Sequence, residues 1–325
     1  MKIAILGVGA YAIALSKVFN KNKNNTISMW AKFRDEADIV MTKRENPGVL
    51  PGVKIDEDIE ITNDLQKCMT DAKIVVLAVP AGAVRQVSEE VSFHARKDQI
   101  LVVVSKGIEP RTNMFMSDIV YQATKNENIC MLAGPSFAIE IANGSKTGFN
   151  VASSNPEAAK IVKDAFENDG LVVTEWDDII GIEVASSMKN VFAIFMGMLD
   201  GMGKPESYKS SCLVALIKDL ETAIKALGGK AETIFTYAGL GDMLLTCMSS
   251  KSRNFTFGTY IGKGYTMEEA FNTMSVKTVE GIYTLGTITD LMEQKNFKIR
   301  SLEVLHGILY KGDSKDNLIE KIRME

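Results

Sequence analysis

The chain has 325 residues, of which 46% are hydrophobic and 24% charged, a balance typical of a globular protein long enough for two domains. Its formal net charge of -4 provides no basic field, so we expect no nucleic-acid partner and no anionic membrane partner. No segment approaches the roughly 18 uninterrupted apolar residues of a membrane span, and the apolar N-terminus has no convincing cleavage site.

The cysteines and histidines indicate which metal sites and which catalytic bases to expect. The four cysteines are scattered and form no CxxC pair, which favours free thiols in a reducing cytoplasm. The two histidines, His94 and His306, lie in no motif, which argues against a histidine-built metal site and against a histidine base. We therefore expect no metal, and we expect lysine, aspartate or glutamate to carry any proton transfer.

The first half of the chain alternates buried apolar runs with helical patterns. Runs of Val, Ile and Leu without polar alternation are typical of parallel strands buried on both faces, so the pattern predicts a doubly wound α/β sheet of the Rossmann type. The predicted strands are 2–6, 26–30, 72–80, 99–105 and 128–134, extended by 150–153 and 171–176, with helices at 10–22, 82–92, 111–123 and 156–168.

The pattern changes after about residue 178. It is helical from there almost to the C-terminus, with breaks at the glycine pairs around 228–229, 239–241 and 262–264. We therefore predict two domains, a dinucleotide-binding domain over 1–180 and a mostly α-helical substrate domain over 181–325. The apolar helices of the second domain could form a homodimer contact, although core packing explains them equally well.

The stretch "ILGVGAYAIAL" follows the first strand and opens a helix. Gly7 and Gly9 provide the first two glycines of a GxGxxG/A fingerprint, and Ala12 takes the third position. The first glycine permits a tight turn, the second lets a pyrophosphate approach the backbone, and the helix N-terminus favours negative charge. The alternative is a glycine turn without a ligand, but the flanking strand and helix favour dinucleotide binding.

The choice of cofactor depends on the residues after the second strand. An acidic residue there usually binds the ribose 2′-hydroxyl of NAD, whereas this chain has Lys32, Phe33 and Arg34. A cation could hold a 2′-phosphate, so the sequence favours NADPH, with NADH left open. A solvated basic turn is the competing interpretation.

Further motifs follow in order: "LPGV" (50–53), "VSKGIE" (104–109), "AGPSFAIEIA" (133–142), "MKNVFAI" (188–194), "AGLGDMLLTCMSSKSRNFTFG" (238–258) and "VEGI" (279–282). Together with the fingerprint, the chain resembles the NAD(P)-dependent glycerol-3-phosphate dehydrogenases of the soluble bacterial type over its whole length. The resemblance implies a Rossmann domain, a helical domain and a site between them. It also implies reversible reduction of dihydroxyacetone phosphate to sn-glycerol 3-phosphate, which supplies glycerophospholipid synthesis.

The resemblance also implies roles for individual residues. Lys189 matches the proton acceptor of the family, and Lys106 matches a lysine that contacts both cofactor and substrate. The implied substrate contacts are Lys106, Gly134, Ser136, Lys189, Asn190, Asp242, Ser252, Arg253 and Asn254. The implied cofactor contacts are Gly7, Gly9, Ala10, Tyr11, Ala12, Lys32, Phe33, Lys106, Ala138, Arg253 and Glu280.

Physical chemistry supports part of this assignment. An arginine offers a planar fork of donors to a phosphate, although "SRN" could also be an ordinary polar loop, and Ser136 could simply cap a helix. Burial at the start of an apolar helix and a second cation at Lys106 would both disfavour the charged form of Lys189, whose ordinary pKa is about 10.4. Asp242 could orient Lys189, but a close acid would raise that pKa again. The segment alone favours the alternative that Lys189 extends to solvent from the first helical turn while Asn190 caps backbone groups, and the ordered motifs favour the catalytic role.

Two positions depart from the pattern of the family. Ser207 stands where asparagine is usual and Ala215 where arginine is usual, which concerns the substrate more than the hydride chemistry. The alternatives are therefore a related dehydrogenase that acts on another small phosphorylated ketone or a hydroxyacid, and a catalytically silent protein that only senses the cofactor.

Overall fold

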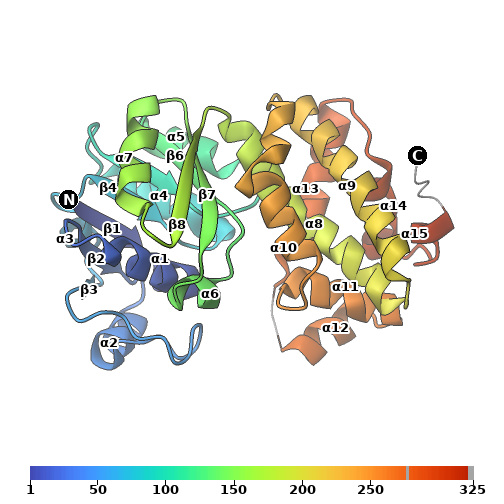
Figure 1. Ribbon diagram of the computed structural model, residues 1–325, viewed down its shortest axis with the longest axis horizontal. Coiled ribbons are helices and arrows are strands. Elements are labelled where there is room, and N and C mark those ends of the chain that lie inside the picture. Colours follow the sequence, from blue (N-terminus) through green and yellow to red (C-terminus); the bar gives the residue numbers. More distant parts are fainter. Residues whose placement is uncertain (276–277, 321–325) are drawn as a thin grey trace. The chain divides into compact units, whose positions relative to one another are not determined.

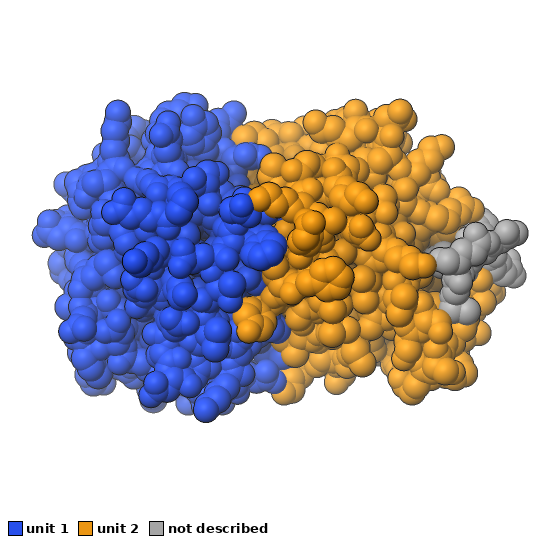
Figure 2. Space-filling model, turned by 45° about the horizontal axis from the view of Figure 1, so that its top comes forward, with its two compact units in different colours: residues 1–106, 116–179 blue, residues 107–115, 180–325 orange. Residues whose placement is uncertain are grey.

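The computed structural model describes residues 1–275 and 278–320 and divides them into two compact units (Figure 2). Unit 1 comprises Met1–Lys106 and Met116–Ile179, and unit 2 comprises Gly107–Phe115 and the chain from Ile180. The segment 107–115 thus groups with the helices that follow, because Ile108 and Phe115, which form a bridge with each other, both pack in the hydrophobic core of those helices. The division into domains 1–180 and 181–325 stays a proposal.

Unit 1 is built on one eight-stranded sheet with the order β3-β2-β1-β4-β5-β6-β7-β8 (Figure 1). All neighbouring pairs are parallel except β6 and β7. The strand order reverses between β1 and β4, and in such sheets ligands bind at the carboxyl ends of the strands at this point. The strands are β1 (Lys2–Leu6), β2 (Thr26–Trp30), β3 (Glu60–Thr62), β4 (Ile74–Leu77), β5 (Ile100–Val103), β6 (Ile129–Ala133), β7 (Thr147–Ser153) and β8 (Leu171–Trp176).

Helices cover both faces of this sheet, which confirms the predicted doubly wound α/β class. In Figure 1, α1 and α7 lie over one face, and α4 and α5 lie over the other. The central strands are buried on both sides, as their continuous Val, Ile and Leu runs predicted. The helices are α1 (Ala10–Lys21), α2 (Arg34–Lys43), α3 (Leu65–Met69), α4 (Val84–Ser92), α5 (Met116–Thr124), α6 (Ala138–Ala142) and α7 (Pro156–Phe166).

One strand departs from the parallel direction of the predicted sheet, since β7 runs antiparallel to β6. The reason lies in the connection between them. A parallel crossover needs an element that carries the chain back along the whole strand, usually a helix. The only helix here, α6, has 5 residues and is about 7.5 Å long. The chain therefore turns and pairs directly with the strand it has just left.

Four other elements differ from the sequence prediction. The helix expected from residue 111 begins at Met116, because Arg111 and Asn113 take positive φ angles of 75° and 57° that no right-handed helix contains. Strand β3, helix α2 and the five-residue helix α3 were not predicted. The strand has three residues at the sheet edge, and α2 buries only Ala37 and Val40, so neither leaves a strong apolar pattern.

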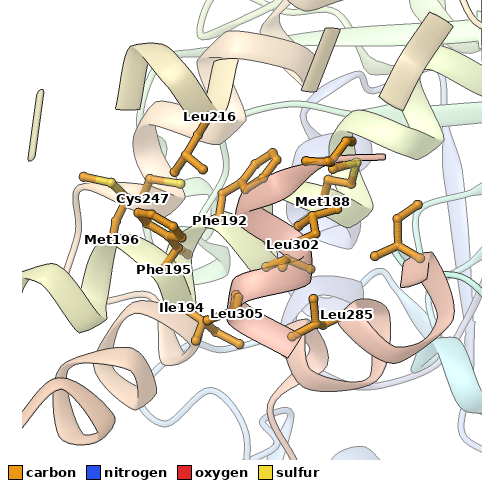
Figure 3. Close-up of a cluster of buried hydrophobic side chains, with 14 of the residues drawn as sticks. Met188, Phe192, Ile194, Phe195, Met196, Leu216, Cys247, Leu285, Leu302 and Leu305 are labelled. Carbon is orange, nitrogen blue, oxygen red and sulfur yellow. The ribbon is translucent and has the colours of Figure 1, made fainter. Parts of the chain in front are cut away.

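Unit 2 is helical, as predicted. Its core gathers side chains from helices α8 to α15, and Figure 3 shows part of it, including Phe192, Leu216, Cys247, Leu285 and Leu302. A π-helical turn at Tyr237–Gly241 leads directly into α10. The helices are α8 (Ile179–Gly201), α9 (Glu206–Ala226), α10 (Asp242–Cys247), α11 (Arg253–Lys263), α12 (Met267–Met274), α13 (Glu280–Gln294), α14 (Arg300–Lys311) and α15 (Asn317–Glu320).

Helix α8 is the central element of unit 2. It begins ten residues before Lys189, so the interpretation that Lys189 lies in a first turn is wrong. By length and composition it could cross a membrane, which no uninterrupted apolar run had indicated, but 89% of its most apolar window is buried within the protein. That burial is typical of the core helix of a folded domain.

Glycines bring α8 and α11 into backbone contact. A Cβ at Gly197 would lie 2.0 Å from the carbonyl oxygen of Phe255, and one at Gly258 would lie 2.1 Å from that of Ile194. Gly201 and Gly262 make the same approach one turn further along. Because the obstructing atoms belong to the backbone, any side chain at these positions would force the two helices apart.

Candidate active site

The glycine turn of unit 1 has the geometry that its sequence predicts. Gly7 has a φ of +130°, and a Cβ there would lie 2.5 Å from the carbonyl oxygen of Ala78, at the end of β4. Gly9 differs, because a Cβ there would meet no atom within 4 Å. Ala12 is fully buried where helix and strand pack. The first glycine therefore serves the turn, and the second leaves room beside the backbone.

The N-terminus of α1 suits an anion. Its N-cap is Gly9, no side chain caps it, and its first turn contains no acidic residue. The first amide groups of a helix then point at the open space with the positive end of the helix dipole behind them. These features fit the pyrophosphate of a dinucleotide.

Replacing Gly9 by alanine tests this arrangement. The φ of -71° suits alanine and the Cβ would meet no protein atom, so we expect an unchanged melting temperature. The added methyl would occupy the space beside the pyrophosphate, so we expect NADH to bind about ten-fold more weakly in calorimetry. Gly48→Ala, on the surface of the same unit with its nearest atom at 3.7 Å, is the matched control. Unchanged NADH affinity in Gly9→Ala would contradict the site.

Other predicted cofactor residues of unit 1 lie on several separate segments, mostly at the starts of helices. Ala10 and Tyr11 open α1, and the Tyr11 hydroxyl lies 3.1 Å from Ser136 Oγ. Phe33 is the N-cap of α2 and is 66% exposed, an unusual position for a large apolar ring. Ala138 begins α6, and Lys106 is the last residue before the chain enters unit 2.

Two residues of the "AGPS" stretch have structural roles that the sequence did not reveal. A Cβ at Gly134 would lie 2.4 Å from the carbonyl oxygen of Gly148, so packing against β7 explains this glycine. Ser136 does not cap α6, whose N-cap is Phe137, and instead donates to the Gly134 carbonyl at 2.9 Å. The substrate contacts predicted for Gly134 and Ser136 stay predictions.

In unit 2, Lys189 lies inside a polar cluster within the apolar core. Its Nζ donates to Asp242 Oδ1 at 2.5 Å and to Thr246 Oγ1 at 3.0 Å. The Lys189 side chain is 10% exposed and that of Asp242 is 1% exposed, so the ion pair is largely removed from water. The predicted contact between Asp242 and Lys189 is therefore present, and the alternative of a solvent-extended lysine is wrong.

Helix α10 explains why this cluster holds together. Asp242 and Thr246 are one turn apart on the helix, and Thr246 Oγ1 also donates to the Asp242 carbonyl at 2.6 Å. Cys247 lies beneath, with Sγ 3.8 Å from the Lys189 carbonyl oxygen. Burial raises the pKa of the Cys247 thiol, which keeps this neighbour of the ion pair neutral.

A second polar chain begins at Asn190. The backbone amide of Gly281 donates to Asn254 Oδ1 at 2.9 Å, and Asn254 Nδ2 donates to Asn190 Oδ1 at 3.0 Å. Asn190 Nδ2 in turn donates to Glu280 Oε2 at 3.2 Å. The sequence of donors and acceptors fixes the orientation of both amides, and it connects α8, α11 and α13 beside Lys189.

The remaining predicted residues lie at the start of α11. Ser252 is buried and caps this helix by accepting from the Phe255 amide at 3.3 Å, a local role the sequence did not reveal. Arg253 follows as the first helical residue and is exposed.

The structure thus brings predicted residues together in two groups, one in each unit. Gly7, Gly9, Ala10 and Tyr11 form the group in unit 1, while Lys189, Asn190, Asp242 and Asn254 form the group in unit 2. The approach of Lys106 to Lys189 stays a prediction. Thr246 was not predicted, although its spacing of four residues from Asp242 on a short helix places both side chains on one face.

Comparisons with known proteins agree with this arrangement. The family model for the N-terminus of NAD-dependent glycerol-3-phosphate dehydrogenase matches residues 2–159, and the model for its C-terminus matches residues 178–320. A glycerol-3-phosphate dehydrogenase [NAD(P)+] of Fusobacterium nucleatum is 32% identical over 99% of this chain and 96% of its own. One of Bacillus licheniformis is 32% identical over 99% of this chain and 93% of its own.

Solved structures show the same likeness. The glycerol-3-phosphate dehydrogenase of Coxiella burnetii matches with a TM-score of 0.92 and 25% identity, over 98% of this chain and 97% of its own. That of Plasmodium falciparum, at 22% identity over 99% of this chain and 95% of its own, shares the fold with a TM-score of 0.91. The chain therefore belongs to the NAD-dependent glycerol-3-phosphate dehydrogenase family, and is an NAD(P)-dependent oxidoreductase.

Proposed function

We propose that this protein catalyses the reversible reduction of dihydroxyacetone phosphate to sn-glycerol 3-phosphate with NADH or NADPH. The observation that carries the proposal is the buried cluster of Lys189, Asp242 and Thr246 in a chain of this family. A lysine held in a fixed position by an acid and a hydroxyl suits proton transfer to one substrate oxygen.

The chemistry divides between cofactor and protein. The reduced nicotinamide supplies a hydride to the carbonyl carbon of the substrate. Lys189 supplies the proton that the carbonyl oxygen takes up, and it accepts that proton in the oxidising direction. Asp242 stabilises the ammonium form of Lys189, and Thr246 orients it, because both accept hydrogen bonds from Nζ. Lys106 completes the proposed site as a second cation near the carbonyl and the cofactor.

The substrate phosphate is assigned to Arg253. Its exposed guanidinium at the start of α11 offers charge-assisted donors in a planar fork. Asn254, by contrast, already uses its amide to bond Asn190 and Gly281, so it positions Asn190 in this proposal.

Arg253→Ala tests the phosphate assignment. Losing a charged hydrogen-bond donor costs about 1.5–3 kcal/mol, so we expect KM for dihydroxyacetone phosphate to rise about 10- to 100-fold. Activity with unphosphorylated dihydroxyacetone should stay at its low wild-type level, because that substrate has no phosphate to lose. Lys263→Ala, a cation at the other end of the same helix, is the control. Equal losses with both substrates would contradict the assignment.

The activity itself is tested by the fall in NADH or NADPH absorbance when dihydroxyacetone phosphate is added. We expect turnover with this ketone and none with a hydroxyacid in the reverse direction. The departures at Ser207 and Ala215 lie on α9, outside the contacts of Lys189 described above, so they do not favour another substrate.

Three wider aspects belong to the same proposal. The product would supply glycerophospholipid synthesis. A cytoplasmic location agrees with four cysteines that are all free and buried. The homodimer stays a prediction, which the mass measured by light scattering would test.

A further inference from the structure

Lys32, the residue expected to bind a 2′-phosphate, already has a charged partner. Lys32 lies two residues beyond β2, whose last carbonyl, on Trp30, accepts from the Gly7 amide at 2.8 Å. This places the backbone of Lys32 beside the glycine turn, where the adenosine ribose of a dinucleotide binds. Its Nζ lies 2.6 Å from Oε1 of Glu90 on α4.

The pair of Lys32 and Glu90 is partly shielded from solvent. The side chains of Lys32 and Glu90 are 27% and 36% exposed, and they come from elements 58 residues apart. The neighbouring cation, Arg34, is 80% exposed, and its nearest acid, Asp38, lies 4.0 Å away. Lys32 is thus the cation that the fold holds in place, and Glu90 is the residue that holds it.

We propose that Glu90 is a specificity residue that weakens the binding of NADPH relative to that of NADH through its ion pair with Lys32. This proposal rests on the proposed function, because it assumes a dinucleotide in unit 1. A 2′-phosphate approaching Lys32 brings negative charge close to the Glu90 carboxylate. It must then share the ammonium group or displace the carboxylate, and either course reduces the binding gained. The 2′-hydroxyl of NADH brings no charge and avoids this cost.

The pair therefore moderates the preference that the basic turn would otherwise give. Without Glu90, the sequence around Lys32 favours NADPH. With Glu90 in place, the ammonium charge is already compensated, and both cofactors become acceptable.

Binding of two nucleotides measures this effect without turnover. Adenosine 2′,5′-bisphosphate carries the 2′-phosphate, and 5′-AMP lacks it. In calorimetry we expect Glu90→Gln to bind the bisphosphate about ten-fold more tightly than wild type, with affinity for 5′-AMP changed less than about two-fold. The KM ratio of NADPH to NADH should fall by the same factor.

Two further variants make the test specific. Glu89→Gln removes the same charge from the exposed neighbouring position on α4 and should leave both affinities unchanged. In a Lys32→Ala background, Glu90→Gln should lose most of its effect, because the gain comes from the released ammonium.

Failure would take distinct forms. Unchanged or weaker binding of the bisphosphate by Glu90→Gln, with 5′-AMP still bound, would overturn the role of Glu90 and leave the dehydrogenase intact. An equal gain in bisphosphate affinity from Glu89→Gln would show that any lost negative charge on α4 has this effect. That result would also overturn the role of Glu90. Binding of neither nucleotide by the wild type would instead overturn the cofactor site on which both proposals depend.

Discussion

Lys189→Met is expected to lower kcat for dihydroxyacetone phosphate by about 1,000-fold, because the variant retains hydride transfer but has no proton donor at the carbonyl oxygen. The cofactor residues of unit 1 are unchanged, so NADH should bind with wild-type affinity in calorimetry. The methionine is apolar and similar in length, so it fills the buried channel of the lysine stem. Stopped-flow measurement of a single turnover separates this chemical defect from slow product release.

The substitution also affects folding, and a second variant separates the two effects. Removing one partner of a buried pair leaves Asp242 charged and 1% exposed, at a cost of about 3–5 kcal/mol. Lys189→Met combined with Asp242→Asn removes both charges and should recover most of the melting temperature but none of the turnover.

Lys209→Met provides the matched lysine control. Lys209 is also little exposed, at 13%, and pairs with Asp200 at 2.8 Å, but on α9 and away from the cluster. The variant Lys209→Met should lose some stability and retain the wild-type kcat. Wild-type turnover by the double variant Lys189→Met, Asp242→Asn would contradict the role of Lys189 as the proton donor.

The sequence predicted those parts of the molecule that repeat a local pattern. The bounds of β1 and β2 agree with the runs "KIAIL" and "TISMW", because a strand buried on both faces must be apolar throughout. The glycine turn was equally predictable, since Gly7 takes a backbone conformation that few other residues adopt and Gly9 leaves space beside the backbone for a ligand.

Features that depend on residues distant in sequence could not be predicted in this way. The direction of β7 follows from the shortness of α6, and the start of α5 follows from positive φ angles at Arg111 and Asn113, which no composition marks. The pair of Lys32 and Glu90 joins two elements whose relative positions only the folded sheet determines. Lys189 was identified through the ordered motifs, and its position in the middle of α8 became clear only from the helix itself.

Gly258→Ala is expected to destabilise unit 2 by about 3 kcal/mol or more, although alanine normally favours a helix by about 1 kcal/mol over glycine. The new Cβ would lie 2.1 Å from the Ile194 carbonyl oxygen, and backbone cannot rotate away as a side chain can. Helices α8 and α11 must then separate by roughly an ångström. The midpoint of urea unfolding, followed by circular dichroism, measures the loss.

The same displacement should reach the site. Asn190 lies one turn before Ile194 on α8, Asn254 lies one turn before Gly258 on α11, and their amides bond at 3.0 Å. Separating the helices lengthens that bond, so kcat should fall together with stability. Gly286→Ala on α13, where the nearest side-chain atom is Tyr310 Oη at 3.4 Å, should be neutral or stabilising. An unfolding midpoint for Gly258→Ala at or above that of Gly286→Ala would show that the glycine contact does not set the spacing of these helices, and hence does not position Asn190 beside Lys189.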